Sequence, residues 1–289
     1  MQDSIEDWIK AGKIAHEVLQ YGKKIAKPGI KILEIADAIE AKIFEMGAKP
    51  AFPTNISLNH VAAHYAPSKN DERVFKEGDL MKIDVGVHVN GAIGDTALTI
   101  GSNKELIRAS EDALNAAISL IRPGVELREI GSKIDEVAKS YEFIPIKNLS
   151  GHGLNRFIVH DKPSIPNYDN SDKTKLEEGQ IIAIEPFITD GVGAVTEGGP
   201  SNIYRLVKIK PVRHPIARKV MNLVKKEYKS LPFAKRWVEN KIMGSALAFS
   251  ILTREGILHE YMQLPEKSKH NVAQSEHSII VRDKVKILT

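Results

Sequence analysis

The sequence predicts a mixed α/β (α+β) fold in which two related halves pack as one sheet-centred domain. Three observations predict it: apolar residues recur at helical spacing in several segments, two short strands surround an Asn-Gly turn, and short segments of the first half return in the second half. Helices and strands arranged in two such halves favour a shared sheet with the helices outside it.

Apolar residues at helical spacing predict helices along much of the chain. The predicted helices are residues 4–26, 34–46, 103–122, 127–141, 214–228, 234–239 and 244–255. Residues 49–68 contain three prolines, so loops with short strands are expected there. The run 273–281 is expected to form a strand because most of it favours β-structure.

The stretch from Lys82 to Thr99 is predicted to form a β-hairpin, because Asn90-Gly91 tolerates the positive φ angles of a two-residue turn. Its two carboxylates, Asp84 and Asp95, are nearly equidistant from the turn, and one irregular residue at Gly94 is expected to adjust the register. Two interpretations are open for this pair. Either both acids lie at strand ends and face water, or a cation holds the two repelling carboxylates together.

Three segments of the first half return in the same order in the second half, which rarely happens by chance. Residues 28–35, 55–57 and 77–84 reappear as 123–130, 148–150 and 178–185. The repeat gives Asp84 and Glu185 the same position in the two halves, and a pseudo-two-fold axis brings equivalent positions together. This equivalence favours a metal site over two solvent-facing acids.

Two further segments offer metal ligands. His152 lies between two glycines just before the strands of the second half, and Glu276 is an acid within the run 273–281. The resulting candidate ligands are Asp84, Asp95, His152, Glu185 and Glu276. Four oxygen ligands and one nitrogen ligand suit one or two divalent ions such as Co, Mn, Fe or Zn, and argue against a structural zinc. Two ions bridged by carboxylates generate hydroxide near neutral pH.

Composition excludes several other classes of protein. The chain has no cysteine, so disulfides, zinc–thiolate sites and thiol nucleophiles are excluded, which fits a cytoplasmic location. A net charge of +4 is too small to imply a nucleic-acid partner. No apolar run approaches the length of a membrane span, and the acidic, polar residues 1–8 lead us to expect neither a signal peptide nor a membrane partner.

With these residues in place, the sequence resembles the methionine aminopeptidases of the pita-bread fold over nearly its whole length. The shared segments are Phe52-Pro53-Thr54, Ala62-Ala63-His64-Tyr65, Lys82-Ile83-Asp84-Val85-Gly86, Ile184-Glu185-Pro186-Phe187 and Glu276-His277. The resemblance implies a pita-bread fold and removal of the initiator methionine from nascent polypeptides whose second residue is small.

The family's ligand order of Asp, Asp, His, Glu and Glu falls on the candidate ligands, which implies two divalent metal ions per chain. By resemblance, Asp95 and Glu276 bridge the two ions and Asp84 holds one of them. His152 and Glu185 hold the other ion, and Glu185 also relays the proton of the attacking water.

The resemblance also assigns residues that contact the substrate. His64 and His160 match two unliganded histidines that contact the scissile peptide, so they are catalytic as well as substrate-binding candidates. Phe52 and Val159 match positions that line the methionine side-chain pocket.

The long gap between Glu185 and Glu276 resembles type II of this family, so a helical insertion is expected at residues 210–268 within a single catalytic domain, 1–289. The long N-terminal extension of the eukaryotic type II enzymes is not expected, which leaves the short archaeal form.

Two positions depart from the family pattern. Asn55 stands where glycine is common, and Asp161-Lys162 follows His160 where a small residue and glycine are usual. Because a nearby anion favours imidazolium, Asp161 is expected to raise the pKa of His160.

Two alternative functions remain. A proline-specific dipeptidase or aminopeptidase of the same fold usually has a separate domain before the catalytic one, whereas the first repeat here begins at residue 28. A non-enzymatic relative that binds the ribosome or RNA is expected to lack the metal ligands. Basic residues of the insertion that suggest such binding, or alternatively lie on solvated helix faces, are Arg213, Arg218, Lys219, Lys225, Lys226, Lys229, Lys235 and Arg236.

The expected partners follow from the peptidase interpretation. They are nascent polypeptide N-termini, with ribosome contact left open. A monomer is expected because no apolar stripe is left over in the sequence.

Overall fold

The structure is a computed structural model that describes residues 5–289. Its helices are α1 Ile5–Ile25, α2 Ile32–Glu45, α3 Lys104–Ser119, α4 Leu127–Ser140, α5 Pro215–Glu227, α6 Lys235–Glu239 and α7 Ala246–Arg254. Each lies within a few residues of a predicted helix. The predicted first residue of the first helix, Ser4, lies outside the described residues. No helix in the described part is long and apolar enough to cross a membrane.

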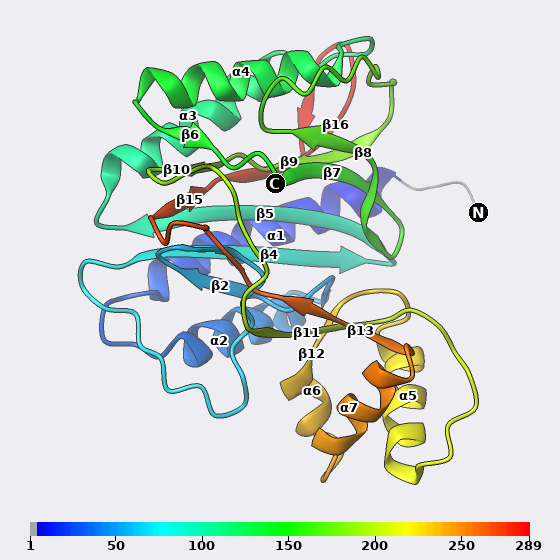
Figure 1. Ribbon diagram of the computed structural model, residues 1–289. Coiled ribbons are helices and arrows are strands. Elements are labelled where there is room, and N and C mark those ends of the chain that lie inside the picture. The colour runs from blue at the N-terminus through cyan, green and yellow to red at the C-terminus, as the bar shows by residue number, and fades with distance from the viewer. Residues whose placement is uncertain (1–4) are drawn as a thin grey trace.

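The strands form one large curved sheet and three small ones (Figure 1). They are β1 Lys49–Pro50, β2 Asn55–Leu58, β3 Val61–Ala63, β4 Leu80–Val89, β5 Ala92–Gly101, β6 Ile144–Pro145, β7 Ser150–Asn155, β8 Ile158–Pro166, β9 Ile181–Ile184, β10 Phe187–Thr189, β11 Pro200–Leu206, β12 Phe233–Ala234, β13 Leu258–Met262, β14 Leu264–Pro265, β15 Val272–Gln274, β16 Glu276–Ile280 and β17 Lys286–Ile287. The large sheet has the order β1-β4-β5-β16-β9-β7-β8, with β2 beside β4 and β17 beside β16. The mixed α/β fold class is confirmed.

The internal repeat is visible in the backbone hydrogen bonds of the two halves. The turn glycines Gly29 and Gly124 both have positive φ, at 98° and 87°. Gly29 N–H donates to the Phe75 carbonyl at 2.8 Å, and Gly124 N–H donates to the Leu176 carbonyl at 2.7 Å. The equivalent isolated β-bridges are Lys31 with Val74 and Glu126 with Lys175. The two halves therefore repeat the same local structure.

Strand alternation places the two equivalent acids on the same side of the sheet. In β4, Ile83 and Val85 pack into the core beneath α1 and α2, so Asp84 between them points to the opposite face. In the second half, Ile184 at the end of β9 packs beneath α3 and α4, and Glu185 follows it. Helices α1–α4 thus cover one face of the sheet and leave the face with Asp84 for the site.

The hairpin forms as predicted around Asn90 and Gly91, whose φ angles are 52° and 92°. Its register is regular throughout: Asp84 pairs with Ala97, and Asp95 pairs with Gly86. The two acids therefore lie diagonally on one face. The expected irregularity at Gly94 is wrong, because a diagonal arrangement brings the acids together without a bulge.

Gly94 is required for a different reason, which is the close approach of α1 to the sheet. A Cβ atom at Gly94 would lie 2.6 Å from the Cα of Gly12 and 2.7 Å from the backbone of Ala11. A Cβ atom at Gly12 would in turn collide with the backbone of Leu288. Glycine at these points therefore sets how closely α1 packs on β5.

In the sequence, helices α5–α7 follow β11 and precede β13. In space they form a separate group below the sheet (Figure 1). They enclose a hydrophobic cluster of their own around Phe233, Phe249 and Leu252. Among the basic residues of this segment, Arg236 is fully buried and pairs with Glu40. Arg236 is therefore neither on a solvated helix face nor available to RNA, because its charge is compensated inside the protein.

Replacing Gly94 by alanine is expected to lower the free energy of unfolding by about 1–3 kcal/mol, because the added methyl group forces α1 away from β5. Gly199→Ala is the matched control, since the atom nearest to its added Cβ lies 3.5 Å away. It is expected to change stability by less than about 0.5 kcal/mol. Urea unfolding measures both, and equal effects would contradict the close packing.

Candidate metal centre and substrate cavity

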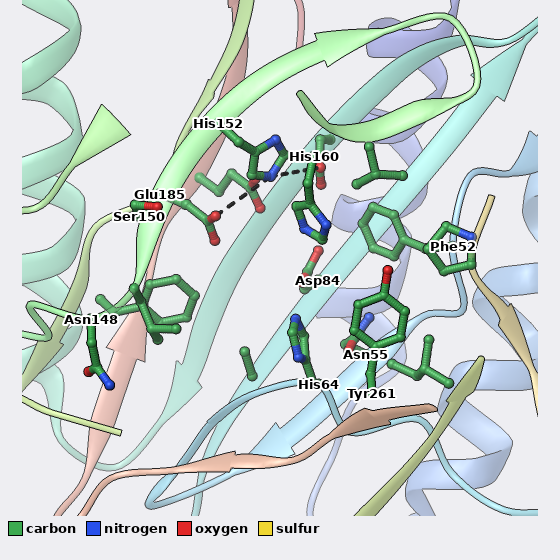
Figure 2. A pocket seen from close by; sticks show the side chains of 18 residues that line it. Phe52, Asn55, His64, Asp84, Asn148, Ser150, His152, His160, Glu185 and Tyr261 are labelled. Atoms are coloured by element: carbon green, nitrogen blue, oxygen red, sulfur yellow. Dashed lines mark ion pairs between the residues drawn. The ribbon is translucent and has the colours of Figure 1, made fainter. Parts of the chain in front are cut away.

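A cavity of about 210 Å³ opens on the face of the sheet away from α1–α4 (Figure 2). Every site residue predicted from the sequence lines it: Phe52, His64, Asp84, Asp95, His152, Val159, His160, Glu185 and Glu276. These residues come from both halves and from segments far apart in the chain. The fold therefore brings the predicted set together in one cavity.

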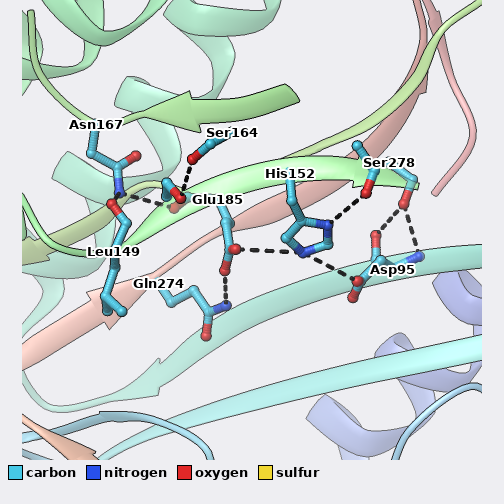
Figure 3. A network of polar contacts seen from close by, with 10 residues as sticks. Asp95, Leu149, His152, Ser164, Asn167, Glu185, Gln274 and Ser278 are labelled. Carbon is cyan, nitrogen blue, oxygen red and sulfur yellow. Dashed lines mark hydrogen bonds and ion pairs between the residues drawn. The ribbon is translucent and has the colours of Figure 1, made fainter. Parts of the chain in front are cut away.

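Three of the candidate ligands form a tight buried group. One ligand atom from each of Asp95, His152 and Glu276 lies within 4.8 Å of the other two. These residues lie on β5, β7 and β16, which are held by ladder pairs β16–β5, β16–β9 and β9–β7. His152 Nε2 also lies 3.6 Å from Glu185 Oε1 and 3.9 Å from Asp95 Oδ2 (Figure 3).

Asp84 lines the same cavity but lies outside this tight group. Its Oδ1 atom is buried and has no hydrogen-bond partner in the structure. A buried carboxylate oxygen without a partner is costly unless it is protonated or bound to a cation. Asp84 therefore has an unused ligand atom in the wall of the cavity.

The electrostatics of the site disfavour four free carboxylates. Burial raises the pKa of Asp84 to about 7. Burial, reinforced by the neighbouring carboxylates, also raises the pKa values of Asp95, Glu185 and Glu276 well above their usual range. None of the ion pairs recorded among residues 5–289 joins these four groups to lysine or arginine. Divalent cations would supply the missing positive charge.

His152 is prepared to act as a nitrogen ligand. Its Nδ1 lies 3.1 Å from the Gly153 carbonyl, to which it can only donate, so the lone pair is left on Nε2 facing the carboxylates. Burial, together with the nearby His160, lowers the pKa of His152 to about 3, so the ring is neutral at physiological pH. A neutral imidazole and four carboxylates fit divalent metal binding.

His64, in the loop after β3, and His160, on β8 of the large sheet, both line the cavity and are also neutral (Figure 2). Loss of contact with bulk water in the cavity lowers the pKa of each to about 4, and Arg205 contributes at His160, whose side chain keeps part of its surface exposed. The His160 ring meets the His152 ring edge to face at a centroid distance of 4.6 Å, and the His64 ring meets Tyr261 at 5.5 Å. Each neutral ring keeps one N–H to donate and one lone pair to accept.

The expected effect of Asp161 on His160 is wrong. Burial and then Arg205 lower the pKa of His160, and Asp161 does not counter them. The two residues are neighbours on β8, whose register with β7 is irregular on both sides of Asp161. The Asp161 carboxylate instead accepts hydrogen bonds from Asn155 Nδ2 at 3.2 Å and from the Lys162 backbone N–H at 2.8 Å.

Several cavity residues were not predicted. Tyr261 and Pro232 lie within the expected insertion and Ile203 lies on β11 before it, and no sequence motif marks them. Residues 148–150 also line the cavity, and here a signal existed: they repeat residues 55–57, and Asn55 lines the cavity as well. The repeat therefore extends from the ligands to the cavity walls.

Comparison with known proteins identifies the family. The model of metallopeptidase family M24 matches residues 6–226. The chain belongs to this family. Curated M24 relatives include the methionine aminopeptidase of Archaeoglobus fulgidus, which is 48% identical over 98% of this chain and 97% of its own. That of Methanocaldococcus jannaschii is 43% identical over 97% and 96%. Methionine aminopeptidase 2 of Neurospora crassa is 35% identical over 99% of this chain and 72% of its own.

Solved structures show the same fold. A methionine aminopeptidase from Thermotoga maritima matches with a TM-score of 0.73 at 24% identity, covering 100% of this chain and 97% of its own. A thermophilic Arx1 matches with a TM-score of 0.85 at 19% identity, covering 100% and 91%. The prolidase of Pyrococcus furiosus matches with a TM-score of 0.62 at 20% identity, covering 100% and 64%. At these identities the likeness shows the pita-bread fold alone.

Metal affinity is expected to rise with pH, because a divalent ion must displace protons from carboxylates such as Asp84, whose pKa is about 7. Because the pKa of Asp84 is higher in the folded than in the unfolded chain, protonated Asp84 favours the folded, metal-free protein. This stabilisation is fully present below the unfolded pKa of about 4 and is lost as the pH rises through about 7. We therefore expect Mn²⁺ to raise Tm by several degrees more at pH 8 than at pH 5.5. Calorimetry at pH 6.5 in two buffers should show net proton release, and a heat independent of the buffer would contradict it.

Asp161→Ala is expected to leave the acid limb of the pH–rate profile unchanged, because the Asp161 carboxylate bonds to Asn155 and to the Lys162 N–H, and the pKa of His160 is set by burial and Arg205. The measurement is kcat/KM of metal-loaded protein from pH 5 to 8, with Arg205→Gln as the comparison. Arg205→Gln removes the charge that lowers the pKa of His160 and is expected to move that pKa upward. A downward shift of the acid-limb pKa in Asp161→Ala would show instead that Asp161 raises the pKa of His160.

Proposed function

We propose that this chain is a metal-dependent methionine aminopeptidase that removes the initiator methionine from nascent proteins with a small second residue. The observation that carries the proposal is the cavity in which a neutral His152 faces four mutually repelling, buried carboxylates. Membership of family M24 and nearly full-length sequence identity of 42–48% to archaeal methionine aminopeptidases support it.

We propose that Asp84, Asp95, His152, Glu185 and Glu276 would hold two divalent ions, with Asp95 and Glu276 shared between them. When bound, the ions polarise the scissile carbonyl and lower the pKa of a water molecule. Glu185, whose pKa burial raises, accepts the proton of the attacking water and passes it on. Gln274 Nε2 lies 3.3 Å from Glu185 Oε2 and restrains the carboxylate (Figure 3).

The neutral histidines act on the peptide bond. His64 and His160 can each donate one N–H to a peptide oxygen or accept from a peptide nitrogen without introducing a charge. Both histidines line the cavity that holds the carboxylates, and the His160 ring lies against the His152 ring, so a peptide bond bound at the carboxylates is within their reach. We propose this hydrogen bonding as their role in substrate binding and catalysis.

Phe52 and Val159 are proposed to line the pocket for the methionine side chain. They belong to one hydrophobic cluster together with Leu231 and Ile93. The Phe52 ring lies directly against the backbone of Gly86, where any side chain would collide with it. An unbranched thioether side chain fits such an apolar pocket.

The alternatives are less well supported. This chain covers 97% of the Thermotoga methionine aminopeptidase but only 64% of the Pyrococcus prolidase. A binding protein without activity would have no need to keep four uncompensated carboxylates in its cavity. We propose a single catalytic domain, 1–289, that contains an insertion at 210–268.

We propose nascent chains in the cytoplasm as the partner, and a monomer as the active form. Ribosome contact through the insertion has weaker support. Arg236 is buried, Lys235 pairs with Glu239 at 3.8 Å, and Arg218 bonds to the Val212 carbonyl at 3.4 Å. Ribosome co-sedimentation at low salt that is lost at high salt would support it, and no binding at low salt would refute it.

Metal-reconstituted peptidase activity is the direct test. Protein stripped with a chelator and reloaded separately with Co, Mn, Fe or Zn is expected to release methionine from Met-Ala-Ser. Glu276→Ala and His152→Ala are each expected to lower kcat/KM by more than about 100-fold, since even residues that only support metal ligands cost 10–100-fold. The exposed residues Glu111 and His16 provide matched alanine controls.

Two outcomes would contradict the proposal. Cleavage of Ala-Pro-Ala or of a dipeptide ending in proline, without methionine release, would make the chain a proline-specific peptidase. No cleavage with any metal, although calorimetry detects bound ions, would leave a binding protein.

A further inference from the structure

Three parts of the chain that are distant in sequence meet at the buried carboxylate of Glu40 on α2. Glu40 Oε1 accepts hydrogen bonds from Arg236 Nη2 at 2.5 Å and from the Thr54 backbone N–H at 3.2 Å. Glu40 Oε2 accepts from Trp237 Nε1 at 2.7 Å. Both oxygens are therefore partnered, and the donors come from α6 of the insertion and from the loop that follows β1.

Arg236 extends this contact to a second loop. Its Nη1 donates to the Pro67 carbonyl at 3.2 Å, while its Nε pairs with the half-exposed Asp37 at 3.2 Å. The planar guanidinium presents several donors in a fixed fork, so one side chain can hold Glu40 and Pro67 at the same time. We call the contact of Glu40 and Arg236 with Thr54 and Pro67 the brace.

Both backbone anchors of the brace lie next to cavity walls. Thr54 lies between Phe52 and Asn55, which both line the cavity. Pro67 lies three residues after His64, which also lines it. The brace therefore touches no cavity atom itself but holds the two loops that carry the walls.

The loop after His64 is one that needs external support. His64 has a φ of 61°, a left-handed conformation that a residue other than glycine keeps only when its surroundings hold it. The next three carbonyls all accept hydrogen bonds. Tyr65 accepts from Ile56 N–H at 2.8 Å, Ala66 from Asn202 Nδ2 at 3.1 Å, and Pro67 from Arg236.

We propose that Glu40 and Arg236 are positioning residues, through which helix α6 of the insertion fixes Phe52 and His64 in the geometry that fits a methionine side chain. The inference rests on the proposed function, because it concerns the substrate of that same cavity. The insertion is then part of the specificity apparatus. A buried ion pair by itself is weak evidence for a gain in stability. The inference rests instead on the hydrogen bonds that join this pair to the loops at Thr54 and Pro67.

Kinetics test this role with Glu40→Gln and Arg236→Lys. Each variant keeps the size or charge of the residue but breaks the fork between Arg236 and its acceptors. KM for Met-Ala-Ser is expected to rise about tenfold or more, because small displacements of positioning groups have effects of this size. The preference for Met-Ala-Ser over Leu-Ala-Ser is expected to fall, while kcat changes less than KM.

Two controls separate positioning from stability. Asp37→Asn removes the half-exposed partner of Arg236 and is expected to leave KM and the Met/Leu preference unchanged. Phe249→Leu loosens the insertion core without touching the brace, so it lowers Tm but not the Met/Leu preference. Folded Glu40→Gln and Arg236→Lys variants with a lower Tm but wild-type KM and preference would overturn the proposal.

Hydrogen exchange gives a readout that needs neither metal nor substrate. In the wild type, the Thr54 amide is expected to exchange as slowly as the amides of β4, and in both brace variants the segments 50–57 and 62–68 are expected to exchange faster, with α3 unchanged. A fast-exchanging Thr54 amide in the wild type would overturn the proposal even if a variant failed to fold. A wild type without methionine release, but with a protected Thr54, would instead refute the proposed function and leave the brace intact.

Discussion

The mutual burial of four carboxylates is the constraint on which this structure depends. Asp84, Asp95, Glu185 and Glu276 face one cavity, and each raises the cost of ionising its neighbours. A protein keeps such an arrangement only if the carboxylates are protonated or share cations. The neutral His152, with its free lone pair turned toward them, indicates cations. The repulsion between these carboxylates destabilises the metal-free protein, and its relief favours the binding of divalent ions.

The sheet satisfies this constraint through its alternation and its internal symmetry. Core residues such as Ile83 and Val85 hold β4 against the helices, so the acid between them must point into the cavity. The pseudo-two-fold repeat then supplies Glu185 from the second half in an equivalent position. Neighbouring strands hold the remaining ligands in a continuous ladder, and this makes the site rigid. Rigid placement is what a metal site requires.

The insertion contributes in a different way. It has a core of its own, yet its helix α6 sends Arg236 into the catalytic part, where Glu40 and the loops behind Phe52 and His64 meet it. Tyr261 of the insertion and Ile203 beside it line the cavity directly. The metal centre is thus built by the repeated halves, whereas the substrate walls are shared between the halves and the insertion.

The sequence by itself determined the helices, the Asn-Gly hairpin, the internal repeat and the ligand types, because these follow from local periodicity, turn chemistry and residue identity. Even the meeting of Asp84 with Glu185 was predictable, since the repeat implies symmetry. Only the tertiary structure decided that the acids lie diagonally without a bulge, that the Asp161 carboxylate bonds to Asn155, and that Tyr261 lines the cavity. It also decided that Arg236 is buried. These outcomes depend on which distant surfaces pack together, and no local pattern encodes that choice.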